Sequence, residues 1–155
     1  MFRISKMTDY GTLVLAHLAE MGDQPTAASE ISGRTGLGAA TVSKLLKSLA
    51  RADLVTSRRG ATGGYRLARQ PSEISAADII DAIEGPVAIT DCAADGHGCD
   101  LEAVCGLGSA WQQINSNIRK ALREISLTDL KGERPIPTEM PLLPMKQILH
   151  KDALR

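Results

Sequence analysis

The chain has few aromatic residues and no long apolar segment. One Trp, two Tyr and one Phe make up 3% of its 155 residues, which argues against an aromatic platform for single-stranded nucleic acid. No apolar run approaches the roughly 18 residues that a membrane span needs, and no signal-peptide core follows the charged N-terminus. These absences predict a soluble, cytoplasmic protein with no membrane partner. The length suits one compact domain with an additional element.

Basic residues are absent from the middle of the chain, although the formal net charge is zero. Residues 1–71 contain ten Lys/Arg and five Asp/Glu, whereas residues 72–108 contain eight Asp/Glu and no Lys or Arg. Residues 109–155 return to eight basic and five acidic residues. A polyanion would therefore bind the basic first part, and the acidic middle must face elsewhere.

Two helices are expected in the first 34 residues. The first spans about residues 8–21, with Thr8 or Asp9 as its N-cap and an apolar stripe that includes Leu13. After a turn, a second, short helix begins at Thr26 and ends near Arg34. A glycine-containing link then leads into a third helix.

The third helix, at about residues 39–51, is amphipathic. Val42, Leu45, Leu46 and Leu49 recur at i, i+3, i+4 and i+7, so they face one core. Two short helices joined by a glycine-containing turn form a helix-turn-helix, whose second helix enters the major groove of DNA. The polar and basic flanks of the stripe are the expected DNA contacts: Thr41, Ser43, Lys44 and Lys47.

A β-hairpin is expected directly after the third helix. Residues 54–57 and 65–67 are β-prone, and a glycine-rich tip at residues 60–64 separates them. Arg58 and Arg59 lie at the neck of this hairpin, where they would contact phosphates or the minor groove, and Gly63 and Gly64 would let the backbone approach the duplex. The pattern predicts a mainly α, winged helix-turn-helix DNA-binding domain over residues 1–71.

The second half is expected to connect and pair two such domains. A helix capped by Ser75 and Asp78 extends to Glu84, and residues 86–107 form a loop. A long C-terminal helix follows at about residues 109–125, with its apolar residues spaced for helix-helix pairing. This dimerisation seam consists of Trp111, Ile114, Ile118, Leu122 and Ile125, with Ala121 beside it. Residues 72–130 thus form the loop and dimerisation helix, and the proline-containing residues 131–155 form a mobile tail.

Three cysteines lie within this loop: Cys92, Cys99 and Cys105. Their odd number argues against a disulfide scaffold, and they lack the paired spacing of a structural zinc site. Three thiolates from one loop suit an iron–sulfur site, and a thiol-based redox switch is the chief alternative. His97 and Asp9 are candidates for a fourth ligand, and spacing does not decide between them.

The chain resembles the iron–sulfur winged-helix regulators typified by IscR and NsrR, most of all the regulators of SUF-type iron–sulfur assembly. The resemblance covers roughly residues 1–130. It rests on ISKMTDYG, TVSKLLK, RGATGGYRL, EGPVAITDC and CDLEAVC, which begin at residues 4, 41, 59, 84 and 99.

This resemblance implies that the three cysteines ligate a cluster, that the third helix and the wing contact DNA, and that the long helix dimerises. Members similar to IscR have a His shortly after the last Cys as fourth ligand, but this chain has glycines at residues 106 and 108. Members similar to NsrR use an Asp of the partner's first helix, which favours Asp9 here. Because the chain lacks the His that members similar to IscR have after the last Cys, the choice between a 2Fe–2S and a 4Fe–4S cluster stays open.

The resulting hypothesis is a homodimeric transcription regulator of iron–sulfur assembly genes that binds a palindromic promoter operator. Cluster occupancy would reposition the long helices and thereby change the spacing between the third helix of one protomer and that of its partner. The competing functions are a cluster-free thiol-based regulator and a cluster-carrying interaction protein. An enzyme with a small-molecule substrate is not expected, because the chain lacks a Cys-x-x-Cys pair, a nucleotide-binding glycine motif and a Ser/His/Asp set.

Overall fold

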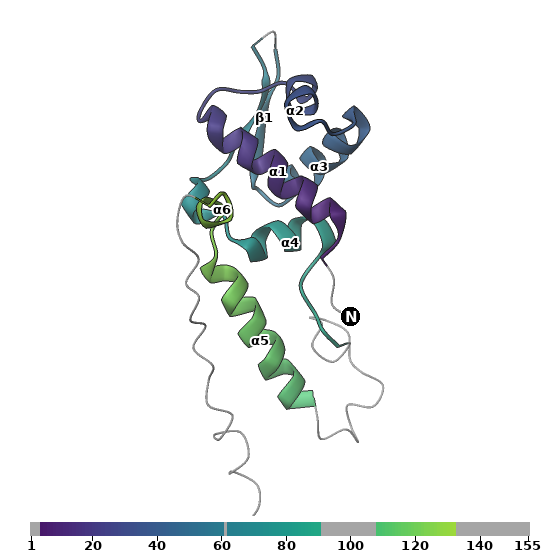
Figure 1. Ribbon diagram of the computed structural model, residues 1–155, viewed down its shortest axis with the longest axis vertical. Coiled ribbons are helices and arrows are strands. Elements are labelled where there is room, and N and C mark those ends of the chain that lie inside the picture. Colours follow the sequence, from purple (N-terminus) through teal and green to yellow (C-terminus); the bar gives the residue numbers. More distant parts are fainter. Residues whose placement is uncertain (1–3, 61, 91–107, 133–155) are drawn as a thin grey trace, which may run out of the picture.

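The computed structural model describes residues 4–60, 62–90 and 108–132. Its helical elements are α1 (Lys6–Met21), α2 (Ala28–Thr35), α3 (Ala39–Arg51), the short 3₁₀ helix η1 (Pro71–Glu73), α4 (Ala76–Glu84), α5 (Gly108–Glu124) and α6 (Leu127–Leu130). Strands β1 (Val55–Arg58) and β2 (Gly64–Leu67) form a hairpin between α3 and η1. Figure 1 shows a head made of α1 to α4, the hairpin and α6, from which α5 projects.

The apolar stripe of α3 forms the centre of the core, as its spacing predicts. Val42, Leu45, Leu46 and Leu49 are at most 1% exposed and pack with Val14, Leu15 and Leu18 of α1. Each such side chain stabilises the fold by about 1.5–3 kcal/mol relative to an exposed one. The expectation for Leu13 is wrong, since this residue is 44% exposed and lies beside the buried face of α1.

The expected start and N-cap of α1 are wrong. The helix begins at Lys6, its N-cap is Ser5, and no side chain of its own accepts a hydrogen bond from its first turn. Thr8 and Asp9 therefore lie inside the helix. Instead, Glu84 at the end of α4 accepts hydrogen bonds from the Ser5 N–H at 3.0 Å and from the Thr8 hydroxyl. A distant carboxylate thus takes the place of the N3 side chain of a capping box, which accepts a hydrogen bond from the N–H of the N-cap residue.

The second helix begins two residues later than expected because Thr26 pairs with the hairpin. The Thr26 N–H donates to the Tyr65 carbonyl at 2.9 Å, and the Tyr65 N–H donates to the Thr26 carbonyl at 2.8 Å. The strands pair antiparallel in a register that places Thr56 opposite Arg66 and Arg58 opposite Gly64. Thr26 therefore borders β2 on the edge away from β1.

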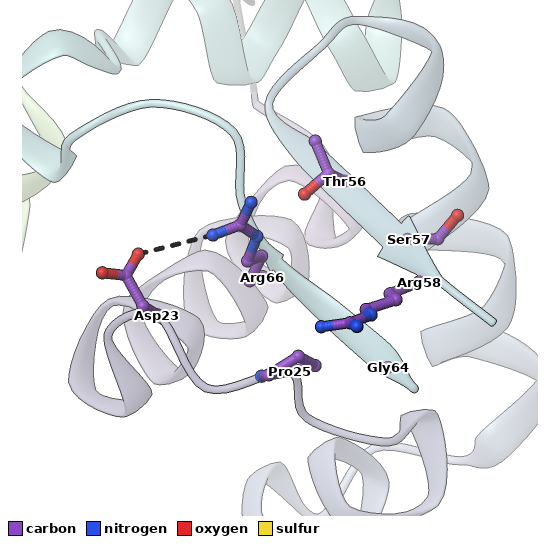
Figure 2. Close-up of a pocket in the computed structure, with 7 residues that line it drawn as sticks. All are labelled: Asp23, Pro25, Thr56, Ser57, Arg58, Gly64 and Arg66. Carbon is purple, nitrogen blue, oxygen red and sulfur yellow. Dashed lines mark ion pairs between the residues drawn. The ribbon is translucent and has the colours of Figure 1, made fainter. Parts of the chain in front are cut away.

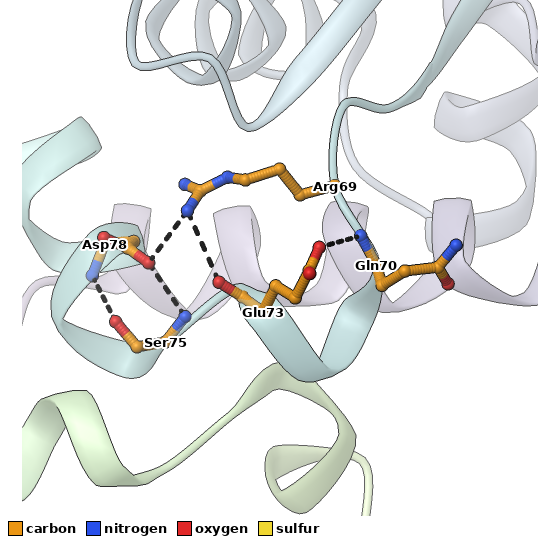
Figure 3. Close-up of polar contacts among 5 residues, drawn as sticks. All are labelled: Arg69, Gln70, Glu73, Ser75 and Asp78. Carbon is orange, nitrogen blue, oxygen red and sulfur yellow. Dashed lines mark hydrogen bonds and ion pairs between the residues drawn. The ribbon is translucent and has the colours of Figure 1, made fainter.

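Capping boxes form the N-termini of α4 and α6. The Ser75 hydroxyl accepts from the Asp78 N–H at 3.1 Å, and the Asp78 carboxylate accepts from the Ser75 N–H at 3.0 Å, as the sequence predicts. Figure 3 shows Arg69 beside this box, 3.6 Å from Asp78 and donating to the Glu73 carbonyl. Ser126 and Asp129 repeat the arrangement at α6.

Helix α5 returns the chain to the head through a short backbone pairing. Ala76 donates its N–H to the Ile125 carbonyl at 2.8 Å, and Leu127 donates its N–H to the Ile74 carbonyl at 2.7 Å. Arg119 and Asp81 add a 2.9 Å ion pair between α5 and α4. The start of α5 differs from the expected one by a single residue. Within the described ranges, none of the helices is both long and apolar enough to span a membrane.

Candidate nucleic-acid interface and cysteine loop

The polar face of α3 is open to solvent. Ser43, Lys44 and Lys47 are exposed and Thr41 is half-buried, while the apolar stripe beside them is buried. The buried stripe holds α3 against α1, so it fixes the direction in which the basic side chains project. The structure therefore presents all four predicted residues on one supported helix, with two lysines separated by three positions.

The wing places two more predicted residues next to one another. Arg58 is the last residue of β1 and Arg59 follows it, and both are exposed. They give the neck of the hairpin an exposed basic surface.

The structure gives the two wing glycines an intramolecular role. A Cβ on Gly64 would lie 2.6 Å from the carbonyl carbon and oxygen of Thr26, and a Cβ on Gly63 would clash with the Arg58 carbonyl oxygen. Both positions therefore require glycine for the fold itself. Their approach to DNA stays a prediction.

Sequence reasoning missed Arg66 as a member of this surface. Arg58 and Arg66 line a hollow together with Thr56, Ser57, Gly64, Asp23 and Pro25 (Figure 2). Arg66 lies 3.6 Å from Asp23. The period-two alternation of a strand puts Arg66 on one face with Gly64, but its place beside Arg58 depends on the pairing register of the two strands, which the sequence does not specify.

The predicted cluster ligands Cys92, Cys99 and Cys105, and the alternative ligand His97, lie outside the described residues. Among the residues that are described, no group of three or more His, Cys, Asp or Glu could hold a metal ion.

The end of α4, the helix that precedes the cysteine loop, lies beside the first turn of α1. Glu84, the last residue of α4, contacts Ser5 and Thr8, and Asp9 follows as an exposed residue of the same turn. The hydrogen bonds from Thr8 and Ser5 keep the pKa of Glu84 below its ordinary value, because they stabilise the carboxylate form. The residue thus links the two segments as an anion.

A helix-turn-helix followed by a basic wing defines the class of winged-helix transcription regulators. Residues 4–133 match the family model of Rrf2, described as iron-dependent transcriptional regulators. The chain belongs to this Rrf2 family.

The similar proteins include regulators named IscR and regulators named CymR. The chain is 31% identical to the HTH-type transcriptional regulator IscR of Aliivibrio salmonicida over 135 residues, which cover 84% of this chain and 80% of that protein. The structure of CymR, the global cysteine regulator of Bacillus subtilis, matches with a TM-score of 0.65 at 29% identity, over 86% of this chain and 99% of that one. The structure of IscR from T. potens matches with a TM-score of 0.61 at 30% identity, over 90% and 93%. These likenesses confirm the winged-helix fold and the regulator class, and they support a DNA partner.

Proposed function

We propose that this transcription regulator binds duplex DNA as a homodimer through α3 and the wing. The observation that carries the proposal is the division of α3 into a fully buried apolar stripe and an exposed face with Lys44 and Lys47. Such a helix is rigidly held and free to enter the major groove. The proposed contacts are Thr41, Ser43, Lys44, Lys47, Arg58, Arg59, Gly63 and Gly64.

The DNA contact is tested by comparing two double variants. Lys44→Ala with Lys47→Ala removes two exposed cations three residues apart from α3, and Lys120→Ala with Arg123→Ala does the same on α5. Removal of each cation that binds a phosphate should reduce the slope of log affinity against log salt by about 0.9. We expect weaker binding and a shallower slope for the α3 pair alone. Equal effects of the two pairs would contradict the assignment.

The proposed dimer uses the apolar face of α5. Trp111 and Ile114 are 39% and 41% exposed in the protomer, and Figure 1 shows α5 projecting from the head. Burial of this face against a second copy would remove apolar area from water. A two-fold dimer would place two α3 helices on half-sites about one DNA turn apart, which is why we propose a palindromic operator.

We also propose that Cys92, Cys99, Cys105 and Asp9 hold an iron–sulfur cluster. The donor set fits, since thiolates are the ligands that such clusters prefer. Asp9 is exposed, is not the N-cap of α1, and lies one residue after Thr8, which contacts the helix leading into the cysteine segment. A bound cluster would make the regulator sensitive to oxidants and iron supply. The proposal is supported by Glu84, which holds the end of the helix before that segment against the first turn of α1.

Cluster ligation is tested on anaerobically purified protein by its visible absorbance. Alanine at any one of the three cysteines should abolish the absorbance, whereas Asp9→Ala should leave a cluster with a shorter lifetime in air. Glu20→Ala removes another exposed carboxylate from α1 and is the matched control. If His97→Ala shortens the lifetime and Asp9→Ala does not, the assignment of Asp9 is wrong.

The likeness to CymR favours a second candidate, regulation by the cysteine thiols without a cluster. That relative is described as a global cysteine regulator, and the solved structures include an oxidised form of Staphylococcus aureus CymR. Low-pKa, accessible thiols can switch reversibly by oxidation. Under this alternative, anaerobically purified protein lacks visible absorbance, and peroxide changes its DNA affinity in a manner reversed by dithiothreitol.

A further inference from the structure

One face of the wing contains a basic hollow that brings Arg58, a proposed DNA contact, together with Arg66, which is not among those contacts. It has a volume of about 370 Å³ and lies between the hairpin and the turn that joins α1 to α2. One water occupies about 30 Å³. A phosphate group, with five heavy atoms, therefore fits in the hollow with part of its hydration shell. Figure 2 shows the side chains of Arg58 and Arg66 extending over one side of the hairpin toward Asp23 and Pro25.

The strand register explains why two cations meet there. Thr56 pairs with Arg66 and Arg58 pairs with Gly64, so the two arginines are diagonal neighbours on one face. Diagonal neighbours in an antiparallel pair lie about 7–8 Å apart. Gly64, opposite Arg58, lies against the Thr26 backbone, where a Cβ would come within 2.6 Å of the Thr26 carbonyl, so this position contributes no side chain to the hollow. The face therefore offers two guanidinium groups and the hydroxyl of Thr56 around an open hollow.

The Asp23 carboxylate beside this hollow is held only weakly by Arg66. Asp23 lies 3.6 Å from Arg66, and the side chains of Arg66 and Asp23 are 50% and 101% exposed. Ion pairs this exposed contribute little to stability, so a competing anion can displace Asp23 at small cost. A phosphate group offers more oxygens than Asp23 does and binds a guanidinium through two parallel hydrogen bonds.

We propose that this hollow binds a backbone phosphate of duplex DNA through Arg66 and Arg58, and that Asp23 is a resident counter-ion that the phosphate displaces. The inference rests on the proposed DNA binding and adds Arg66 and Asp23 to it. Asp23 neutralises Arg66 while the site is empty, and its charge opposes the incoming phosphate. It therefore lowers the affinity for any sequence, because phosphate contacts carry no base information.

The test measures anisotropy of a fluorescent, mixed-sequence duplex of about 30 base pairs, long enough for two half-sites. Arg66→Ala should weaken binding about ten-fold for each protomer of the dimer, the value of one charge-assisted hydrogen bond at the low end of its range. It should also reduce the salt slope by about 0.9 per protomer. Asp23→Asn should tighten binding several-fold, and this gain should fall to less than half when Arg66 is already Ala. Arg123→Ala on α5 is the matched control and should change binding little.

Three outcomes separate the possibilities. If Arg66→Ala behaves like Arg123→Ala while Lys44→Ala weakens binding, the hollow is not a DNA contact and the proposed DNA function stands. If Asp23→Asn gives the same gain with and without Arg66, Asp23 acts only through general repulsion, and the counter-ion role is wrong. If the folded wild-type protein binds no duplex at low salt, the proposed function fails together with the inference. Thermal melts of each variant verify the fold.

Discussion

Removal of the Glu84 carboxylate tests how the end of α4 supports the start of α1. Glu84 accepts hydrogen bonds from the Ser5 N–H and the Thr8 hydroxyl, and α1 has no cap of its own. Glu84→Ala removes the acceptor and the charge. Glu84→Gln keeps an acceptor oxygen and removes the charge only, so the pair separates the two contributions.

The size of the effect follows from known capping values. Loss of an N-cap side chain costs about 0.5–2 kcal/mol, and an anion near a helix N-terminus contributes about 0.3–1 kcal/mol. Because Glu84 is exposed to solvent, we expect about 1–2 kcal/mol for Glu84→Ala and about half of that for Glu84→Gln. Glu20→Gln, at an exposed carboxylate in the last turn of the same helix, should cost close to nothing.

The pH dependence has a definite sign. The pKa of Glu84 is lowered in the folded protein, so its stabilising effect is present above the pKa of the unfolded chain and is lost as pH falls through the folded pKa. Urea unfolding at fixed protein concentration should therefore show the gap between wild type and Glu84→Gln at pH 7, and the gap should shrink in acid. A gap that is independent of pH, or that matches the gap for Glu20→Gln, would refute the tertiary-cap interpretation.

Three further changes probe the packing, the interface and a cap. Gly11→Ala should destabilise the protein by about 1–3 kcal/mol, because the new methyl would clash with the Cδ1 atom of Ile83; in urea unfolding, Ile83→Val should restore most of the stability, and no restoration would contradict the contact. Ile114→Asp should convert the dimer to a folded monomer in sedimentation, whereas Ser116→Asp, at another exposed position of α5, should leave it dimeric. Ser75→Ala should cost about 1 kcal/mol by removing the cap of α4, and an unchanged unfolding midpoint would contradict that role.

The elements that were predicted correctly depend on neighbours in the sequence. The stripe of α3 repeats within one helix, and the box of Ser75 and Asp78 lies within three residues, so local patterns contain the necessary information. The N-terminus of α1 was predicted wrongly because Glu84 caps it from 76 residues away. The start of α2 was wrong because Thr26 pairs with Tyr65, a contact that no local pattern specifies.

The same distinction applies to the candidate site. Lys44, Lys47, Arg58 and Arg59 could be predicted because they flank an amphipathic stripe or follow a β-prone segment. Arg66 could not, since its place beside Arg58 depends on the pairing register of the two strands. The cysteine ligands stay predictions, because they lie outside the described residues.

Helix α4 connects the cysteine segment with the helix that is proposed to contact DNA. Its last residue, Glu84, caps α1, and the preceding Ile83 packs on Gly11, whose missing Cβ would lie 3.6 Å from Leu45 of α3. On its other side, Asp81 pairs with Arg119 of α5 at 2.9 Å. We therefore predict that a change in the segment after Glu84 alters the first turn of α1 and, through the packed side chains of Ile83 and Leu45, the position of α3. If Asp9 and the cysteines ligate the same iron–sulfur cluster, the cluster and Glu84 both act on the first turn of α1. Glu84→Ala removes no cluster ligand, but it should then reduce the change in DNA affinity that follows loss of the cluster.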